Sequence, residues 1–208
     1  MPALRQINPH RVRKILSALT RRGWEESFRH RDKGYSAGIR GTGEFKSILA
    51  HGRKFIRGFP IGRLLNGKYR IRLTSFSFES QFGIELFEKN KRIGRVSIGF
   101  TKQAVIIESI HGVRSQGEKA AREVNQDLSP GWPNVLLRRV EETAQKNGYA
   151  EVKIRAPETL YWYKQPATVE KDREKEIRGV QWRMRRFYAK IAHANGYTRM
   201  GNYYVKGL

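Results

Sequence analysis

The chain contains no cysteine, and that absence excludes several kinds of site. Without thiols there is no disulfide framework, no thiolate metal site and no cysteine nucleophile. The five histidines are scattered without metal-ligand spacing, so we expect no metal site. No apolar run approaches the roughly 20 residues that span a bilayer, and the N-terminus lacks the apolar segment of a secretory signal. We therefore expect a cytoplasmic protein without a membrane span.

Acidic residues are scarce relative to basic ones. Lys and Arg number 42 against 19 Asp and Glu, which gives a formal net charge of +23. Such a surplus repels itself in the compact state, so a polyanionic partner is expected. Nucleic acid is the preferred partner, RNA before DNA, with the ribosome, rRNA and tRNA as specific forms of it. An anionic membrane surface stays open as an alternative partner.

The charge is unevenly distributed along the chain. Residues 1–72 hold 18 basic and 4 acidic residues, a net of +14, whereas the other 136 hold 24 and 15, a net of +9. The apolar content of 38% is nevertheless sufficient for a folded core. We therefore divide the chain into a basic, helical and loop-rich extension over 1–67 and a domain over 68–208.

The extension contains the densest candidate contacts for phosphate. Asn8 as N-cap and Pro9 at the first helical position predict a helix that ends at Gly23. Its basic residues are interpreted as a phosphate-contacting face, in preference to a merely solvated one. Residues 30–68 lack sustained periodicity and suit either a loop-rich insertion that wraps a partner or an irregular segment that aromatic side chains anchor to the core.

The full set of predicted nucleic-acid contacts extends beyond that helix. Trp24 and Tyr35 lie among basic residues and are expected to stack on unpaired bases. Trp182 is expected to pack in the core. The predicted cationic contacts are Arg11, Arg13, Lys14, Arg21, Arg22, Arg53, Lys54, Arg57, Arg183, Arg185 and Arg186.

The rest of the chain predicts an α+β domain. Four strands within residues 68–113, joined by short connections, form an antiparallel meander. A helix over 134–147, a strand over 149–156 and a helix over 170–194 follow, and a strand pair closes the chain. Because a helical crossover separates them, the strand at 150–156 should run parallel to the strand at 103–110.

This order of elements resembles the GCN5-related N-acetyltransferase (GNAT) family over residues 68–208. The stretches that carry the resemblance are "GRVSIGFTKQAVIIESIHGV", "LLRRVEETAQKNGYAEVKI" and "RRFYAKIAHANGYTRMGNYYVKGL". The resemblance implies a GNAT-like mixed central sheet with flanking helices. It also implies a general base at Glu108 and a general acid at Tyr188. Without such chemistry, Glu108 would be a carboxylate paired with a basic residue and Tyr188 a packing residue.

In that family coenzyme A binds where a loop leads into the central helix. One alignment assigns Gly131 and Asn134 to the pyrophosphate cradle, and a rival alignment uses Arg114 and Gly117. Such a cradle needs bare backbone N–H groups at a helix N-terminus. Pro133 has no N–H to donate, so weak or no binding of acetyl-coenzyme A is expected.

Three functions therefore stay open. The preferred one is an RNA-binding protein on a GNAT-like fold that has lost its cofactor. The alternative is an acetyl-coenzyme A-dependent N-acyltransferase whose acceptor is RNA-borne or ribosomal. The third is a metal-dependent nuclease, because Glu151 and Lys153 form a Glu-x-Lys pair with Asp127 upstream.

Overall fold

One mixed sheet organises the part of the chain that the structure describes. The structure is a computed structural model, and it describes residues 42–77, 80–112, 123–160, 163 and 171–208. The strands lie in the order β1-β2-β3-β4-β5-β6-β8-β7. They are β1 (Gly62–Leu64), β2 (Tyr69–Ser77), β3 (Ser80–Glu88), β4 (Lys91–Phe100), β5 (Ala104–Gly112), β6 (Glu151–Arg155), β7 (Thr198–Met200) and β8 (Tyr203–Gly207).

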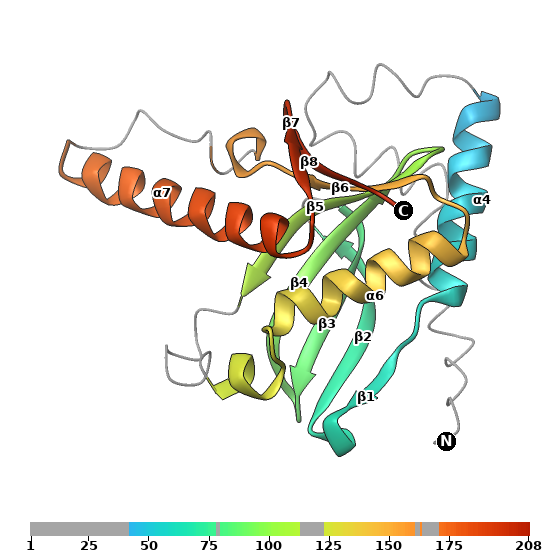
Figure 1. Ribbon diagram of the computed structural model, residues 1–208, viewed down its shortest axis with the longest axis horizontal. Coiled ribbons are helices and arrows are strands. Elements are labelled where there is room, and N and C mark those ends of the chain that lie inside the picture. The colour runs from blue at the N-terminus through green and yellow to red at the C-terminus, as the bar shows by residue number, and fades with distance from the viewer. Residues whose placement is uncertain (1–41, 78–79, 113–122, 161–162, 164–170) are drawn as a thin grey trace.

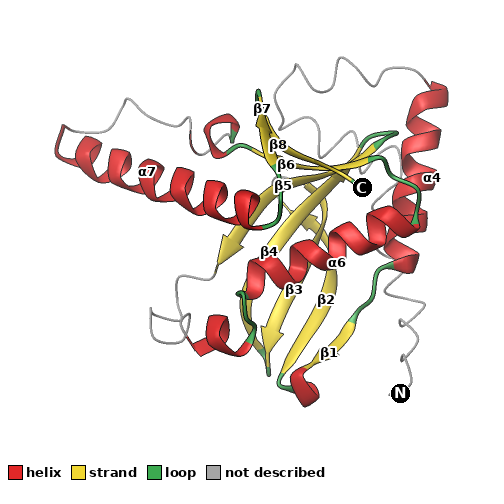
Figure 2. Cartoon of the chain, viewed as in Figure 1, coloured by secondary structure: helices red, strands yellow, loops and turns green. Residues whose placement is uncertain are grey.

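The pairing of the strands confirms the predicted α+β architecture. Strands β2 to β5 form the expected antiparallel meander (Figure 2). Strand β6 pairs parallel with β5, with Val105 opposite Val152 and Ile107 opposite Ile154. The connection contains helix α6 (Trp132–Lys146), which supplies the crossover that a parallel pair requires. The predicted parallel pair is confirmed.

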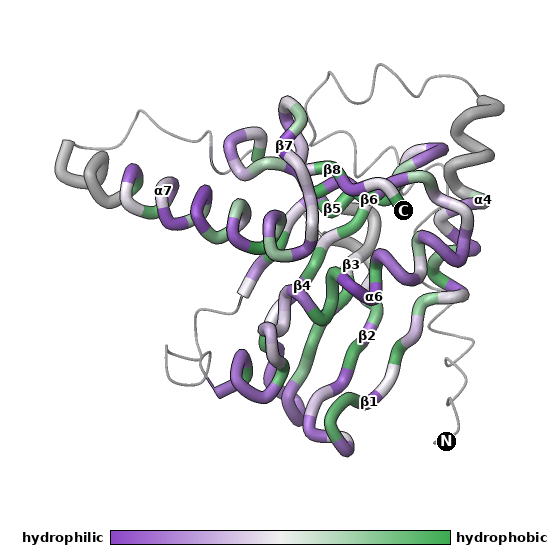
Figure 3. The backbone as a smooth tube through the Cα atoms, in the orientation of Figure 1, coloured by the Kyte–Doolittle hydropathy of each residue, from purple (hydrophilic) through white to green (hydrophobic). Residues whose placement is uncertain are grey.

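Alternation along the strands decides which face of the sheet is the core. In β2, Tyr69, Ile71 and Leu73 are buried, whereas the intervening Arg70 and Arg72 are half-buried. The buried face is covered by α6 and by helix α4 (Thr42–Gly58), which contact each other and β4. Figure 3 shows hydrophobic residues along the middle strands beneath α6.

The helix α4 corrects the expectation that residues 30–68 are irregular throughout. The glycines within α4 interrupt the helical pattern of the sequence. One of them, Gly52, is needed for packing against β4. A Cβ added to Gly52 would lie 2.9 Å from the Phe100 ring, so the glycine allows the helix to lie close to β4. Phe55 and Phe59 are buried. Aromatic anchoring to the core, one of the two sequence interpretations, is confirmed for these two residues.

Helix α7 (Lys171–Ala194) is joined to β6 by a connection that includes a 3-10 turn, η4 (Pro157–Thr159). Its C-terminal end is held in the core by Tyr188 and Ile191, and the rest extends beyond the sheet (Figure 1). Trp182 lies on this extending part and is 57% exposed, so its predicted core packing is wrong. Within the described ranges, no helix combines the length and apolar composition that a bilayer span requires.

A glycine on β4 fixes how closely α6 approaches the sheet. A Cβ built on Gly94 would lie 2.5 Å from the Trp132 ring, which is itself buried. We expect Gly94→Ala to destabilise the protein by about 1–3 kcal/mol, because the indole has to move or leave its site. Urea unfolding measures the change. The control is Gly207→Ala on β8, where a Cβ meets nothing within 4 Å. Equal stability of the two variants would contradict the prediction.

Candidate functional site

Glu108 occupies an irregular position on β5. Ser97 pairs with Ser109 and Ile98 pairs with Ile107, so Glu108 is the extra residue of a β-bulge. Such bulges redirect a side chain relative to the regular pleat. A Cβ at Gly99 would lie 2.8 Å from Glu108 Oε1, so the bare glycine on the neighbouring strand leaves room for the carboxylate.

The carboxylate of Glu108 pairs with an arginine from β6. Arg155 Nε donates a hydrogen bond of 2.6 Å to Glu108 Oε2, and the two side chains are 16% and 3% exposed. The ion pair therefore lies almost wholly out of water. A carboxylate held in this way matches the paired-carboxylate interpretation of Glu108, and a role as a general base would require it to exchange this partner.

Tyr188 is held by the main chain of the same strand. Its side chain is fully buried, and its hydroxyl accepts a hydrogen bond of 2.8 Å from the Ile110 N–H. Ile107 is the last residue of β5 that pairs with β6. The Ile110 N–H lies beyond that pairing and donates its hydrogen bond to the tyrosine hydroxyl instead. This contact fastens α7 to the sheet. The structure thus places both expected catalytic side chains along one segment of β5, each with an intramolecular partner.

The junction that leads into α6 has its amides occupied by the chain itself. The Gly131 N–H donates to the Leu128 carbonyl oxygen. The Trp132 N–H donates to Asn125 Oδ1 at 3.3 Å, and Pro133 has no N–H. An anion at a helix N-terminus needs free, convergent amides, and these amides point to protein acceptors instead.

The side chain of Asn134 is similarly used inside the fold. Its Nδ2 donates to the Pro130 carbonyl oxygen at 2.9 Å, and its Oδ1 accepts from Asn195 Nδ2 at 2.5 Å. This pair of asparagines joins the start of α6 to the end of α7. Gly131 and Asn134 are thus both integrated in the packing of the junction. The rival residues Arg114 and Gly117 lie outside the described residues.

The residues of the nuclease hypothesis do not meet. Asp127 forms an ion pair with Lys68 and accepts a hydrogen bond of 2.6 Å from the Tyr69 hydroxyl at the start of β2. Glu151 pairs with Lys153 at 2.7 Å on β6, and three strands lie between β2 and β6. Across the described part of the chain, no three Asp, Glu or His side chains gather where they could hold a metal ion. The geometry gives this hypothesis no support.

The contact of Asp127 with Lys68 and Tyr69 has a consequence for acid stability. The hydrogen bond from Lys68, followed by that from Tyr69, lowers the pKa of Asp127 below its usual 3.8. A carboxyl whose pKa falls on folding stabilises the protein above its unfolded pKa, and this stabilisation is lost as pH falls through the folded value. We expect Asp127→Asn to lower Tm at neutral pH, and the difference from wild type to shrink as the pH falls below 3.8 toward the lower folded pKa. Thermal unfolding from pH 7 to pH 3 measures it.

The control for that variant is Glu142→Gln, which removes an exposed ion pair with Arg139 within α6. Exposed pairs of this type contribute little to stability. A difference between Asp127→Asn and wild type that stays constant down to the lowest pH would contradict the assignment of the effect to the Asp127 carboxylate.

The outer face of α4 carries three exposed cations that the sequence analysis selected. Arg53, Lys54 and Arg57 point to solvent, opposite the buried Phe55 and Ile56. None of the three forms an ion pair with any residue that the structure describes. These three side chains are therefore the candidate cationic contacts on α4.

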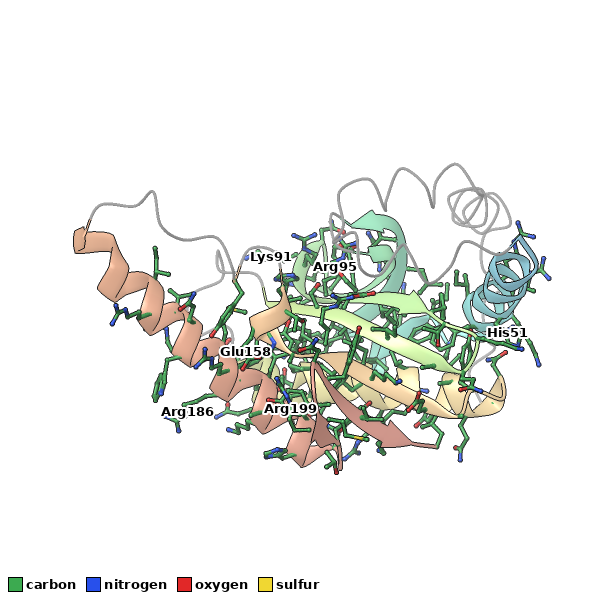
Figure 4. All side chains as sticks on the ribbon, turned by 90° about the horizontal axis from the view of Figure 1, so that it is seen from above. His51, Lys91, Arg95, Glu158, Arg186 and Arg199 are labelled. Atoms are coloured by element: carbon green, nitrogen blue, oxygen red, sulfur yellow. The ribbon has the colours of Figure 1, made fainter. Side chains whose placement is uncertain are left out.

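The extending part of α7 carries the second basic surface. Arg183 and Arg186 are exposed and make no ion pair within the described ranges, and the Arg186 guanidinium lies 4.7 Å from the centre of the Trp182 ring. Arg185 differs, because its Nε lies 3.5 Å from Glu158 and its charge is partly neutralised. In Figure 4, Glu158 and Arg199 lie on the side of α7 toward the sheet, whereas Arg186 lies on its outer side.

Comparisons with protein-family models, with curated proteins and with solved structures give no match for this chain. Its function is therefore inferred from its own charge and geometry.

Sequence reasoning missed two members of the α7 surface. Lys190, one turn beyond Arg186, is exposed, and Trp182 is exposed as well. A signal was present, because residues 177–194 contain no Asp or Glu. The remaining predicted contacts lie outside the described residues and stay predictions: Arg11, Arg13, Lys14, Arg21, Arg22, Trp24 and Tyr35.

Proposed function

We propose that this protein binds nucleic acid, RNA in preference to DNA, through the exposed basic faces of α4 and α7. The observation that carries the proposal is a group of exposed cations on these two helices that have no carboxylate partner in the described part of the chain. On the sheet, on α6 and in the segments next to them, carboxylates pair with nearby cations: Glu85 with Arg92, Glu108 with Arg155, Asp127 with Lys68, Glu141 with Lys206 and Glu151 with Lys153.

Six exposed cations on the two helices have no such counter-charge among the residues that the structure describes. Arg53, Lys54, Arg57, Arg183, Arg186 and Lys190 make up this set. A cluster of unpaired Lys and Arg on a surface is the electrostatic footprint of a phosphate-binding face, because a polyanion relieves the mutual repulsion and releases its counterions.

RNA fits this arrangement better than a straight duplex. The helices α4 and α7 lie at opposite ends of the domain in two perpendicular views (Figures 1 and 4). A folded RNA presents phosphates in several directions and offers unpaired bases to an exposed aromatic side chain. Structured RNA is therefore the proposed partner, rRNA, tRNA and their ribosomal context included.

The domain is proposed to have a GNAT-like fold that has lost the ability to bind coenzyme A. The order of elements and the parallel β5–β6 pair agree with that resemblance. The engagement of the junction amides by Leu128 and Asn125 supports the loss of coenzyme A.

The acyltransferase alternative has one observation in its favour. Strand β5 continues past its pairing with β6, and Glu108 and the Tyr188 contact both lie on that continuation. Isothermal titration with acetyl-coenzyme A separates the two proposals. Micromolar binding of acetyl-coenzyme A would favour the acyltransferase. Heats no larger than the heat of dilution would favour the RNA-binding protein without a cofactor.

The nucleic-acid proposal is tested by filter binding of tRNA and of duplex DNA at about 0.15 M salt. We expect a Kd for the RNA below about 1 µM, tighter than non-specific binding at this salt. Vesicles containing anionic lipid form the third arm. If neither polymer binds at this level, the proposal is wrong, and binding to the vesicles alone would assign the basic surfaces to a membrane.

A further inference from the structure

Trp182 is exposed on the face of α7 that does not pack against the domain. Tyr188 and Ile191, which anchor the helix, lie on the opposite side, since a helix turns about 100° per residue. The indole is 57% exposed. A residue type that normally buries most of its area is thus largely in contact with water.

The surroundings of the indole are cationic. Arg186, one turn along the helix, lies over the ring with its guanidinium carbon 4.7 Å from the ring centre. Arg183 and Lys190 are exposed nearby on the same side of the helix. The segment 177–194 contributes no carboxylate that could neutralise them. A cation over one face of an indole also fixes the orientation of the ring.

We propose that Trp182 is a stacking platform for an unpaired RNA base, and that Arg183, Arg186 and Lys190 hold the phosphates on either side of that base. The inference rests on the proposed RNA binding and assigns it a site and a mode. Any base can stack on an aromatic ring, because every base has a π-face. The site would therefore distinguish single-stranded from paired RNA, and it would not distinguish between base sequences. An adjacent row of cations is the usual companion of such a platform, because it follows the backbone.

Charge decides between this occupant and two others. A second copy of the same face would place like charges against each other without counter-charge on residues 177–194. Insertion into a membrane requires a broad apolar face, but the apolar side of α7 around Tyr188 and Ile191 is turned into the domain. An oligonucleotide supplies both the flat apolar base and the negative charge.

The test compares Trp182→Ala with wild type on two probes of equal length, a single-stranded RNA and a blunt RNA duplex. We expect the variant to bind the single strand about 5- to 150-fold more weakly, which corresponds to the loss of one stacked base. Duplex binding should change less than about twofold, because the phosphate contacts remain. The salt dependence of single-strand binding should keep its slope, while Arg183→Ala/Lys190→Ala flattens it.

Three further measurements keep the outcomes distinct. Trp182→Phe should retain most of the affinity, because the ring can still stack. Leu65→Ala, which truncates a side chain that is 50% exposed on the 3-10 turn η2 (Leu65–Gly67), is the control and should bind as wild type does. Thermal unfolding should give the same Tm for Trp182→Ala and wild type, because the indole is not in the core.

Equal binding of the single strand by wild type and Trp182→Ala would overturn the platform and leave the RNA-binding proposal intact. Absence of RNA binding by the wild type would overturn both. A change from dimer to monomer in sedimentation of Trp182→Ala, with unchanged RNA affinity, would instead assign the indole to contact with a second copy. Loss of vesicle binding with unchanged RNA affinity would assign it to a membrane surface.

Discussion

RNA binding is expected to weaken about 300-fold when salt is raised from about 50 to about 200 mM. Six exposed cations on α4 and α7 are unpaired within the described part of the chain: Arg53, Lys54, Arg57, Arg183, Arg186 and Lys190. Each phosphate that such a cation neutralises contributes about −0.7 to the slope of log affinity against log salt for a single strand. Six contacts therefore give a slope of about −4.

The contribution of α4 to that slope is isolated by Arg53→Ala/Lys54→Ala/Arg57→Ala. Loss of three phosphate contacts should flatten the slope by about 2, and it should weaken binding to all RNA sequences alike. The measurement is filter binding at several salt concentrations.

A matched control removes the same net charge from cations that are already paired. The variant Arg92→Ala/Arg139→Ala/Lys153→Ala deletes the partners of Glu85, Glu142 and Glu151. Its slope should stay within about 1 of wild type, because these cations are not phosphate contacts. If both triple variants flatten the slope equally, binding follows the overall charge of the protein and not the face of α4.

The second large effect is expected at the buried ion pair. Arg155→Met should destabilise the protein by about 3–5 kcal/mol, because it removes the guanidinium that lies 2.6 Å from the buried Glu108 carboxylate. The Glu108 side chain is 3% exposed, so water cannot replace the guanidinium. Urea unfolding measures the change in the free energy of unfolding.

Two controls define what that loss means. Lys153→Met breaks the more exposed Glu151–Lys153 pair on the same strand and should cost less than about 1 kcal/mol. The double variant Glu108→Gln/Arg155→Met removes both charges and should recover most of the stability lost in Arg155→Met. A loss below about 1 kcal/mol in Arg155→Met would show that Glu108 does not depend on this arginine.

The sheet was largely predictable because its information is local. The alternation of apolar and polar residues in β2 to β5, with short connections between these strands, predicts the antiparallel meander. The long helical crossover predicts that β6 runs parallel to β5. The Glu108–Arg155 contact follows from the same topology. Once Ile107 is opposite Ile154 in a parallel pair, the next residue on each strand is Glu108 and Arg155. Neither strand's sequence determines this register by itself, so the Glu108–Arg155 contact could not be predicted from the sequence.

Two features were missed for different physical reasons. Glycine lowers helix propensity, so Gly52 counted against a helix that is stabilised by the burial of Phe55 and Phe59. Tertiary packing outweighed local preference there. Trp182 was assigned to the core by residue type, although it does not share the spacing of Tyr188 and Ile191. Position on the helix, and not hydrophobicity, determined its exposure.

The parallel pair has a consequence for the time course of folding. Neighbours within β2 to β5 are joined by short connections, whereas residues 113–150 must be looped before β5 meets β6. Closing a long loop costs entropy before the β5–β6 contacts can stabilise the chain. We therefore expect the meander to form first and β6 to dock late. Contacts across that pair would then be absent from the transition state, with φ-values near zero. Loss of Arg155 would accelerate unfolding and leave the folding rate nearly unchanged, so this arginine governs how long the native state lasts.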